Sequence, residues 1–445
     1  MVAGILAATE SPTLVLLAGG LLVTTAIVIR PQSTRASAPS HRLIFGLLVA
    51  YTVPLFAFGR EFATIGYKPV FVADVLVVLA ALLMLQRLRY RATAPTAPLT
   101  LLCLILMLLV GHAVYVGLVH GYSGAVKGLV LGVYPVLAAI FAAWLAQQVD
   151  VTAILKWLPK IVLPFAGAGL TVLTIGNALV VPASYGLYLG IGAAFATVPG
   201  MPQRRLLIAT TAIGLFILVA VDAKRGPVAA VVLGSCAASL AARSFTSYSR
   251  RALAVILTLC TLSGFGLLIS IDAINPSQLP VAGHLVARAT ASADSADPSA
   301  ANNVLLRERM WSYALRTTAE DGPLFGVGAY HPIEVARAHE RIGSDPESGV
   351  HNSFVGYAFY AGFPAALIVC IVFALVLWRL WTIRKATIYA PALFGSLVVA
   401  VVTALTNVAL ETTYMGGPSW LLVGAGAGLA AWAQRRPTDT PASST

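Results

Sequence analysis

The stretch from Val304 to Asn352 reads VLLRERMWSYALRTTAEDGPLFGVGAYHPIEVARAHERIGSDPESGVHN, and it interrupts a chain that is otherwise almost continuously apolar. Arg307 and Arg309 open an amphipathic stretch, the turn GPLFGVG follows, and His351 stands where the chain returns to an apolar run. We expect this stretch to fold over the outer mouth of a membrane-embedded site.

The composition excludes a soluble globular protein. Hydrophobic residues make up 58% of the 445 residues and charged residues only 10%, which is typical of a polytopic membrane protein. The net charge is +12, but Lys and Arg of membrane proteins collect in cytoplasmic loops, so it does not indicate a nucleic-acid partner. Each of the four cysteines lies in an apolar run without a close partner, which favours neither disulfides nor a metal site.

Apolar runs of about 16 to 25 residues, separated by charge, Pro or Gly, predict membrane helices. The runs lie at residues 12–29, 43–59, 69–85, 99–119, 125–145, 161–180, 183–198, 206–221, 227–242, 252–271, 352–377, 391–410 and 418–433. We therefore predict an all-α polytopic membrane protein with about 12 to 13 transmembrane helices. The segments around Pro54 and Pro182 are alternatively re-entrant, which would change the number of helices.

Three parts of the chain follow from this pattern. Residues 1–271 hold transmembrane helices 1–10, and residues 272–350 form one large extracytoplasmic loop between the fourth-last and third-last helices. Residues 351–445 hold helices 11–13 and a short cytoplasmic tail. When the loops that hold most of the 29 Lys and Arg residues are placed inside, the N-terminus lies outside and the C-terminus in the cytoplasm.

The large loop has two different halves. Its first half, ATASADSADPSAANN, is low in complexity and predicts a flexible tether. In the second half an apolar residue recurs at helical spacing, which predicts a helix on the membrane surface; the recurring residues are Leu306, Met310, Trp311 and Ala314. Residues 333–341 suggest another short helix, and GSDPESG resembles the loops used as lids.

Some basic residues are predicted on the outer side, against the usual charge distribution. Arg60, which is next to Glu61, either snorkels to the surface or forms a surface ion pair. Lys127 lies a turn inside its helix, where it either snorkels or faces inward as a substrate-binding residue.

Lys224 and Arg225 fall in a tight outer turn, and Gly226 and Pro227 begin the next helix. A helix N-terminus offers free N–H groups and a positive dipole end, and two cations beside it make a phosphate site. The alternative is a merely polar turn in which Asp222 pairs with one of the cations.

His351 is the candidate base, because the positive end of the helix that follows favours a neutral imidazole. Asn352 would cap that helix. The alternative is an interfacial histidine that only satisfies the helix end.

Arg307 and Arg309 diverge on a helix, so one of them shares the face of Trp311 more easily. A guanidinium grips phosphate oxygens in pairs and stays charged in a partly dry site. We expect Arg307 to act on phosphate, and Arg309 to bind substrate or to form an ion pair with Glu308 on the surface.

These segments resemble the O-antigen ligase and polymerase family of bacterial envelope enzymes. KRGP at residues 224–227 is similar to the outer Ser-Arg-Gly turn of the family, with Ala223 and Lys224 where Ser is usual. RERMWSYAL from Arg307 resembles its Arg-x-x-x-Trp helix, and GPLFGVG followed by HNSF resembles its Pro-x-x-Gly-x-Gly and His-Asn signature. The resemblance spans about residues 210–375.

The resemblance implies transfer of a glycan from an undecaprenyl-diphosphate carrier to an acceptor hydroxyl, at the outer face of the bacterial inner membrane and without a metal or cofactor. His351 would be the general base, and Arg225 and Arg307 would neutralise the diphosphate. Lys224, Arg309, Lys127, Arg60, Asn352 and Trp311 would bind the diphosphate or the glycan. The expected partners are a polyprenyl-diphosphate-linked donor, a glycan or glycolipid acceptor and the bilayer.

Two alternatives remain open. A polymerase that joins lipid-linked repeat units would have the same donor site as a ligase. A flippase or transporter of lipid-linked glycans would need charges deep within several helices, whereas most charges here lie at helix ends, with Asp74 as an exception.

Overall fold

The structure is a computed structural model that describes residues 39–58, 60–63, 65–67, 70–88, 97–120, 122–148, 150–156, 184–222, 225–242, 298–328, 331, 336–337, 340–341 and 350–435. Its helices are α3 (Pro39–Phe58), α4 (Arg60–Ala63), α5 (Val72–Leu88), α6 (Ala97–His120), α7 (Tyr122–Ala146), α8 (Val151–Leu155), α10 (Ser184–Thr197), α11 (Arg204–Asp222), α12 (Arg225–Ala241), α15 (Pro298–Asp321), α16 (Ser353–Ala361), α17 (Phe363–Thr382), α18 (Tyr389–Thr406) and α19 (Thr413–Arg435). The predicted runs 12–29, 161–180 and 252–271, the segment GSDPESG, Pro182 and Lys224 lie outside the described residues.

The protein is an all-α polytopic membrane protein, as predicted. Within the described residues, four segments are long and apolar enough to cross a membrane: Pro98–Val119, Gly128–Ala146, Phe363–Thr382 and Tyr389–Thr406. The strands described are two antiparallel pairs of two residues each. β1 (Gly66–Tyr67) pairs with β2 (Val70–Phe71), and β3 (Ala336–Arg337) pairs with β4 (Glu340–Arg341).

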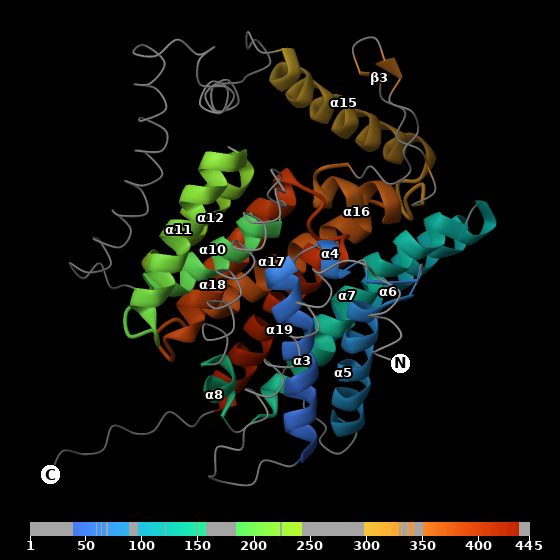
Figure 1. The fold of residues 1–445 in the computed structure, drawn as a ribbon. Coiled ribbons are helices and arrows are strands. Elements are labelled where there is room, and N and C mark those ends of the chain that lie inside the picture. Colours follow the sequence, from blue (N-terminus) through green and yellow to red (C-terminus); the bar gives the residue numbers. More distant parts are fainter. Residues whose placement is uncertain are drawn as a thin grey trace, which may run out of the picture.

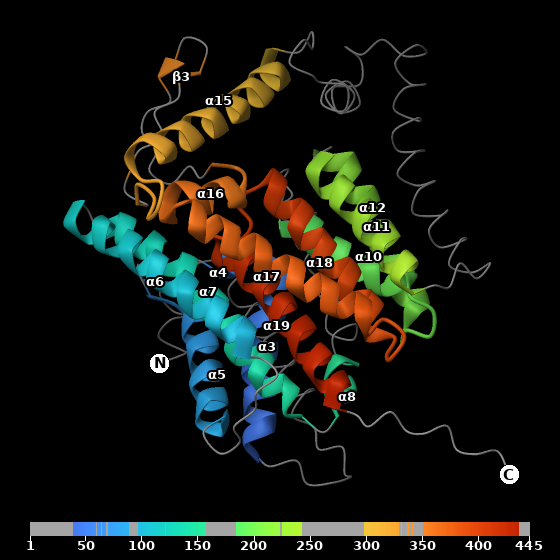
Figure 2. The same cartoon turned by 180° about the vertical axis from the view of Figure 1, so that it is seen from behind.

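Helices α17, α18 and α19 run through the middle of the molecule, between a group formed by α10, α11 and α12 and another formed by α5, α6 and α7 (Figures 1 and 2). α18 packs on α12 and α10, and α19 packs on α7. Gly424 and Gly428, which show small-residue spacing in the sequence, lie against α7 at Ala138 and Ala142. This is the packing role that such spacing indicates.

α15 lies across one end of this bundle, above α16 (Figure 1). Its buried residues include Met310 and Ala314, with Trp311 half-buried, so the predicted amphipathic helix is confirmed. The helix begins earlier than predicted, because residues 298–303 of the supposed tether already belong to it. A proline is well placed in a first helical turn, which explains a start at Pro298.

Two further predictions about this region are wrong. Residues 333–341 contain the β3–β4 pair instead of a helix. The single helix predicted over residues 352–377 is broken at Gly362, which has a φ of +89° that ends α16, and Pro364 then lies in the first turn of α17. His351 therefore precedes the short helix α16 and not the membrane-crossing helix itself.

The turn after α15 is fixed to this break. Val327 N–H donates to Phe359 O at 2.9 Å, and Phe363 N–H donates to Pro323 O at 3.1 Å. Gly326, with a φ of +73°, lies so close to the backbone of Ala361 that a Cβ atom would overlap it. We call these contacts between residues 322–328 and 359–363 the glycine clasp; it attaches the C-terminal end of α15 to the α16–α17 junction.

Candidate active site

The loop between α18 and α19, residues 406–412, is built around the hydroxyl of Ser353; we call it the α18–α19 corner. Ser353 Oγ donates to Glu411 Oε2 at 2.6 Å. The same oxygen accepts the N–H groups of Ala409 at 2.8 Å and of Leu410 at 2.9 Å. The first residue of α16 thus fixes the corner, although the two are far apart in the sequence.

His351 is held between two anchored neighbours. Asn352 caps α16, since its Oδ1 accepts the N–H groups of Phe354 at 3.1 Å and Val355 at 3.3 Å. On the other side, Trp311 Nε1 on α15 donates to Val350 O at 2.8 Å. His351 itself has a φ of +54°, a left-handed conformation that is uncommon for residues other than glycine.

Arg307 reaches the same place from α15. Its Nη1 donates to Thr406 O, the last carbonyl of α18, at 3.2 Å. Partial burial lowers the pKa of this guanidinium. An arginine keeps its charge at neutral pH even so, because its ordinary pKa is above about 12.

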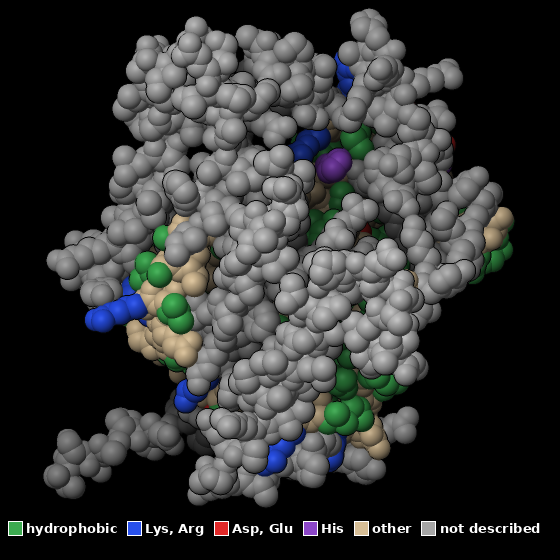
Figure 3. Space-filling view, viewed as in Figure 1, with side chains coloured by type: hydrophobic (Ala, Val, Ile, Leu, Met, Phe, Trp, Pro, Cys, Tyr) green, Lys and Arg blue, Asp and Glu red, His purple; other side chains and the backbone are tan. Residues whose placement is uncertain are grey.

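The surroundings of His351 favour a neutral ring. Burial lowers the pKa of the imidazole most, and the positive charge of Arg307 lowers it further, whereas a side-chain hydrogen bond with Asn407 raises it. Nδ1 is buried and has no hydrogen-bond partner among the described residues. A neutral ring can accept a proton from a hydroxyl group. In Figure 3 a histidine and a basic side chain lie side by side in the upper part of the molecule.

The start of α12 lies at this corner as well. Arg225 is the first residue of α12, and a Cβ atom added to Gly226 would lie 2.8 Å from Thr406 Oγ1. The turn that carries Arg225 therefore packs against the residue whose carbonyl accepts the hydrogen bond from Arg307. The side chain of Arg225 and the whole of Lys224 lie outside what the structure describes.

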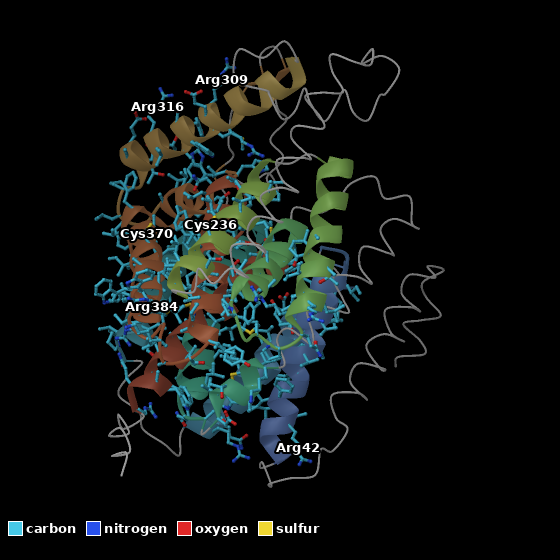
Figure 4. All side chains as sticks on the ribbon, turned by 90° about the vertical axis from the view of Figure 1, so that its left-hand side faces the viewer. Arg42, Cys236, Arg309, Arg316, Cys370 and Arg384 are labelled. Carbon is cyan, nitrogen blue, oxygen red and sulfur yellow. The ribbon has the colours of Figure 1, made fainter. Side chains whose placement is uncertain are left out.

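The remaining predicted site residues have separate positions. Arg309 is exposed on the outward face of α15, together with Arg316 (Figure 4). Lys127 belongs to α7 and Arg60 to α4, and the side chains of both lie outside the described part of the chain. Asn352 and Trp311 each form the structural hydrogen bond given above, and these bonds hold the backbone around His351.

Ser353, Asn407 and Glu411 were not predicted from the sequence as parts of this site. The apolar run predicted over residues 391–410 hid the corner, because α18 in fact ends at Thr406. The sequence did contain one signal of the corner: Glu411 directly follows the apolar run. A carboxylate in such a position is rarely buried without a partner, so it indicates a polar contact. Glu411 is only 6% exposed.

Within the described ranges, no three His, Cys, Asp or Glu side chains lie together as metal ligands would. The candidate site thus consists of an imidazole, guanidinium groups and backbone polar groups.

Residues 209–370 match the family model described as O-antigen ligase. This segment belongs to the O-antigen ligase family. It contains Arg225, Arg307 and His351, and it ends before the α18–α19 corner, which completes the site from outside the segment. No curated protein matches the chain. The match of this segment to the O-antigen ligase family supports glycan transfer of the ligase or polymerase type at a membrane, with a lipid-linked glycan and an acceptor as partners.

Proposed function

We propose that the protein transfers a glycan from an undecaprenyl-diphosphate carrier to an acceptor hydroxyl at the extracytoplasmic face of the bacterial inner membrane. The observation that carries the proposal is that three parts of the O-antigen ligase segment meet at the end of α18. They are the start of α12, Arg307 on α15, and the residues around His351. The start of α12 packs on Thr406, Arg307 bonds to Thr406 O, and Ser353, two residues after His351, bonds to Glu411 of the α18–α19 corner.

In this reaction His351 takes the proton of the acceptor hydroxyl as the oxygen forms a bond with the anomeric carbon. The bond between that carbon and the diphosphate oxygen breaks, and undecaprenyl diphosphate leaves with the electron pair. A general base of this kind contributes about 100- to 10,000-fold to the rate. The lowered pKa of His351 keeps the ring in the form that can accept the proton.

Arg225 and Arg307 neutralise the charge that grows on the departing diphosphate. Guanidinium groups bind phosphate oxygens in pairs, and a charge that is stabilised more in the transition state than in the ground state accelerates the reaction. The N-terminus of α12 adds free N–H groups and the positive end of the helix dipole. Lys224 adds a second cation to the same turn.

A polymerase that extends lipid-linked repeat units would use the same donor chemistry and remains the alternative within this class. The transporter alternative is less favoured. It rests on the helix number and the outward cations and would need charges deep within several helices; Asp74, the exception to their absence, accepts a hydrogen bond from Tyr134 Oη at 3.3 Å. The contact is the local pairing expected of a structural carboxylate.

The experiment uses the purified protein in lipid nanodiscs with an undecaprenyl-diphosphate-linked glycan and a hydroxyl acceptor. We expect release of undecaprenyl diphosphate together with a new glycosidic bond. In proteoliposomes, movement of the donor across the bilayer without a new bond would contradict the proposal and support a transporter.

Arg225→Ala should weaken both donor binding and turnover, because it removes a charge-assisted contact worth about 1.5 to 3 kcal/mol. Arg205→Ala is the matched control, because Arg205 is the second residue of α11, at the other end of that helix from this turn. Equal turnover and donor affinity in Arg225→Ala and the unmodified protein would remove Arg225 from the proposal.

A further inference from the structure

The turn that follows α15 carries two exposed apolar side chains. Leu324 is 61% exposed and Phe325 is 42% exposed, although both lie within the glycine clasp. Asp321, the last residue of α15, is exposed and charged, whereas residues 322–333 hold no Asp, Glu, Lys or Arg. The surface therefore changes from polar to apolar where α15 ends.

This turn packs on the side of α6. The C-terminal end of α15 comes down beside α6 and α16 in both views of the molecule (Figures 1 and 2). The ring centroids of Phe325 and His112 are 4.4 Å apart, and a Cβ atom added to Gly328 would lie 3.1 Å from Val116 Cγ1. His112 is seven residues before Val119, where the membrane-crossing segment of α6 ends. At about 1.5 Å per residue, Phe325 thus lies about 10 Å along the helix from that end.

α6 presents one apolar face to its surroundings. Its exposed residues recur at the spacing of one side of a helix; they are Leu101, Leu104, Ile105, Leu108, Gly111, His112, Tyr115, Leu118 and Val119. In a segment that crosses a membrane, such a face contacts the acyl chains of lipids. Because Phe325 packs on His112, within this face, the turn continues the lipid-facing surface of α6.

α17 brings a second lipid-facing surface to the same turn. The exposed residues of its membrane-crossing segment also follow helical spacing, and they include Phe363, Leu367, Ile371 and Leu375. The N–H of Phe363 donates to Pro323 O at 3.1 Å, so the start of α17 adjoins the turn. Leu324 and Phe325 thereby join the apolar surfaces of two membrane-crossing helices.

We propose that Leu324 and Phe325 form a membrane anchor, which inserts between the lipid acyl chains of the leaflet on the α15 side of the bilayer. Continuity with the lipid-facing surfaces of α6 and α17 selects lipid as the partner, rather than a second copy of the chain. Contact with the membrane falls to this turn, because the apolar face of α15, with Met310 and Ala314, is already buried in the protein. The inference does not depend on the proposed transfer reaction.

The backbone of the turn is suited to an apolar environment. Peptide groups that cannot reach water need partners within the protein, so open loops are not found facing lipid. Here Gly326 N–H donates to Gly322 O at 2.8 Å, and Val327 N–H donates to Phe359 O at 2.9 Å. Pro323 has no N–H group, and its carbonyl accepts the first N–H of α17. The glycine clasp thus pairs groups of the turn that would otherwise need water.

An anchor at this place fixes the level of α15 relative to the bilayer. α15 is held at its C-terminal end by the anchor and, nearer its start, by the hydrogen bond from Arg307 to Thr406 O. Its opposite face is charged, with Arg309 and Arg316 directed away from the bundle (Figure 4). An anchor among acyl chains and a charged outward face together place α15 at the level of the lipid headgroups.

The test measures the collisions of a nitroxide label with oxygen, which concentrates among acyl chains, and with a nickel chelate, which stays in water. The label is attached to Leu324→Cys in the full chain, in a cysteine-free background and in nanodiscs. Leu108→Cys, at an exposed position inside the membrane-crossing segment of α6, is the lipid reference. Leu315→Cys is the matched control, because Leu315 is an exposed leucine next to the exposed Arg316 on α15.

We expect the label at Leu324→Cys to collide more often with oxygen than with the chelate, as at Leu108→Cys, and the label at Leu315→Cys to show the reverse preference. Chelate accessibility at Leu324→Cys equal to that at Leu315→Cys would overturn the proposal, because the turn would then lie in water. Protection of Leu324→Cys from both reagents would also overturn it, because protein, such as a second copy of the chain, would then cover the turn.

A second measurement uses the unmodified chain, so it does not depend on the folding of a variant. Phospholipids with a photoreactive diazirine on the acyl chain are activated in the same nanodiscs, and the labelled peptides are identified by mass spectrometry. We expect label on residues 322–328 as well as on the exposed face of α6. Label on α6 without label on residues 322–328 would contradict the anchor.

Discussion

His351 combines a strained backbone with an ionisable side chain. A left-handed conformation costs a residue with a Cβ atom roughly 1–2 kcal/mol, and such strain persists where the surroundings impose it. The Asn352 cap on one side and the Trp311–Val350 hydrogen bond on the other impose it here. The chain thus keeps an unfavourable backbone conformation at the candidate base.

His351→Gly should separate stability from function. Glycine relieves the strain, so we expect the free energy of unfolding of His351→Gly to exceed that of His351→Ala by about 1 kcal/mol. His351→Gly should therefore unfold at a higher temperature, while both variants lose transfer. Thermal unfolding in the same detergent measures the difference. A lower unfolding temperature for His351→Gly than for His351→Ala would show that the left-handed backbone carries no strain.

In the proposed mechanism, Arg307 sets the pH range in which His351 acts as a base. Its charge lowers the pKa of the ring, so Arg307→Gln should raise that pKa. Because the base must be deprotonated, transfer is lost as the pH falls through this pKa, and the acid limb of the pH–rate profile should move to higher pH in Arg307→Gln.

Arg316→Gln is the control for this shift, because Arg316 is an exposed arginine on the outward face of the same helix (Figure 4). Its acid limb should match that of the unmodified protein. An Arg307→Gln acid limb at the original pH or lower would contradict the electrostatic coupling between Arg307 and His351.

The glycine clasp joins the elements around the site, because it fixes the C-terminal end of α15 to the α16–α17 junction. Gly326→Ala combines an unfavourable φ with overlap on the backbone of Ala361. Gly200→Ala is a matched control, because Gly200 has a similar φ of +75° but nothing within 4 Å of the added Cβ atom.

We expect Gly200→Ala to lose roughly 1 kcal/mol of unfolding free energy and Gly326→Ala to lose clearly more, since a backbone overlap cannot be relieved by a rotamer change. Denaturant unfolding of both variants in one detergent compares them. Equal losses would mean that the turn is not packed on the α16–α17 junction.

Much of this arrangement follows from the sequence. The spacing of Met310, Trp311 and Ala314 predicts the amphipathic face of α15, and Asn352 was predicted as a helix cap. The break at Gly362 was missed, because hydropathy does not change there and only the backbone conformation does. The β3–β4 pair was missed because two-residue strands have no periodicity.

The site was predictable only in part. Arg307 and His351 were named as candidates because their residue types suit phosphate and proton chemistry, and the structure brings both near the end of α18. Ser353 and Glu411 were missed because they meet through a hydrogen bond across more than fifty residues of chain. A sequence pattern cannot show such contacts.

At the scale of the molecule, α15 and the turn between α17 and α18 lie at opposite ends of a helix long enough to cross a membrane. Lys385 lies in that turn, in a basic region expected in the cytoplasm, and Glu320 is exposed on α15. In a cysteine-free background, Glu320→Cys should react with an impermeant maleimide in intact spheroplasts.

Lys385→Cys is its counterpart and should react only after permeabilisation. Labelling of both cysteines in intact spheroplasts, or of Lys385→Cys alone, would contradict the orientation that places the site at the extracytoplasmic face.

The proposed function depends on removal of the acceptor's proton by the His351 imidazole. The most direct measurement is single-turnover release of undecaprenyl diphosphate by His351→Ala, with donor affinity measured in parallel and His112→Ala, an exposed histidine on α6, as control. We predict a loss of about 100- to 10,000-fold in the transfer rate with donor affinity largely kept, and a normal rate for His112→Ala. A normal rate for His351→Ala would contradict the account.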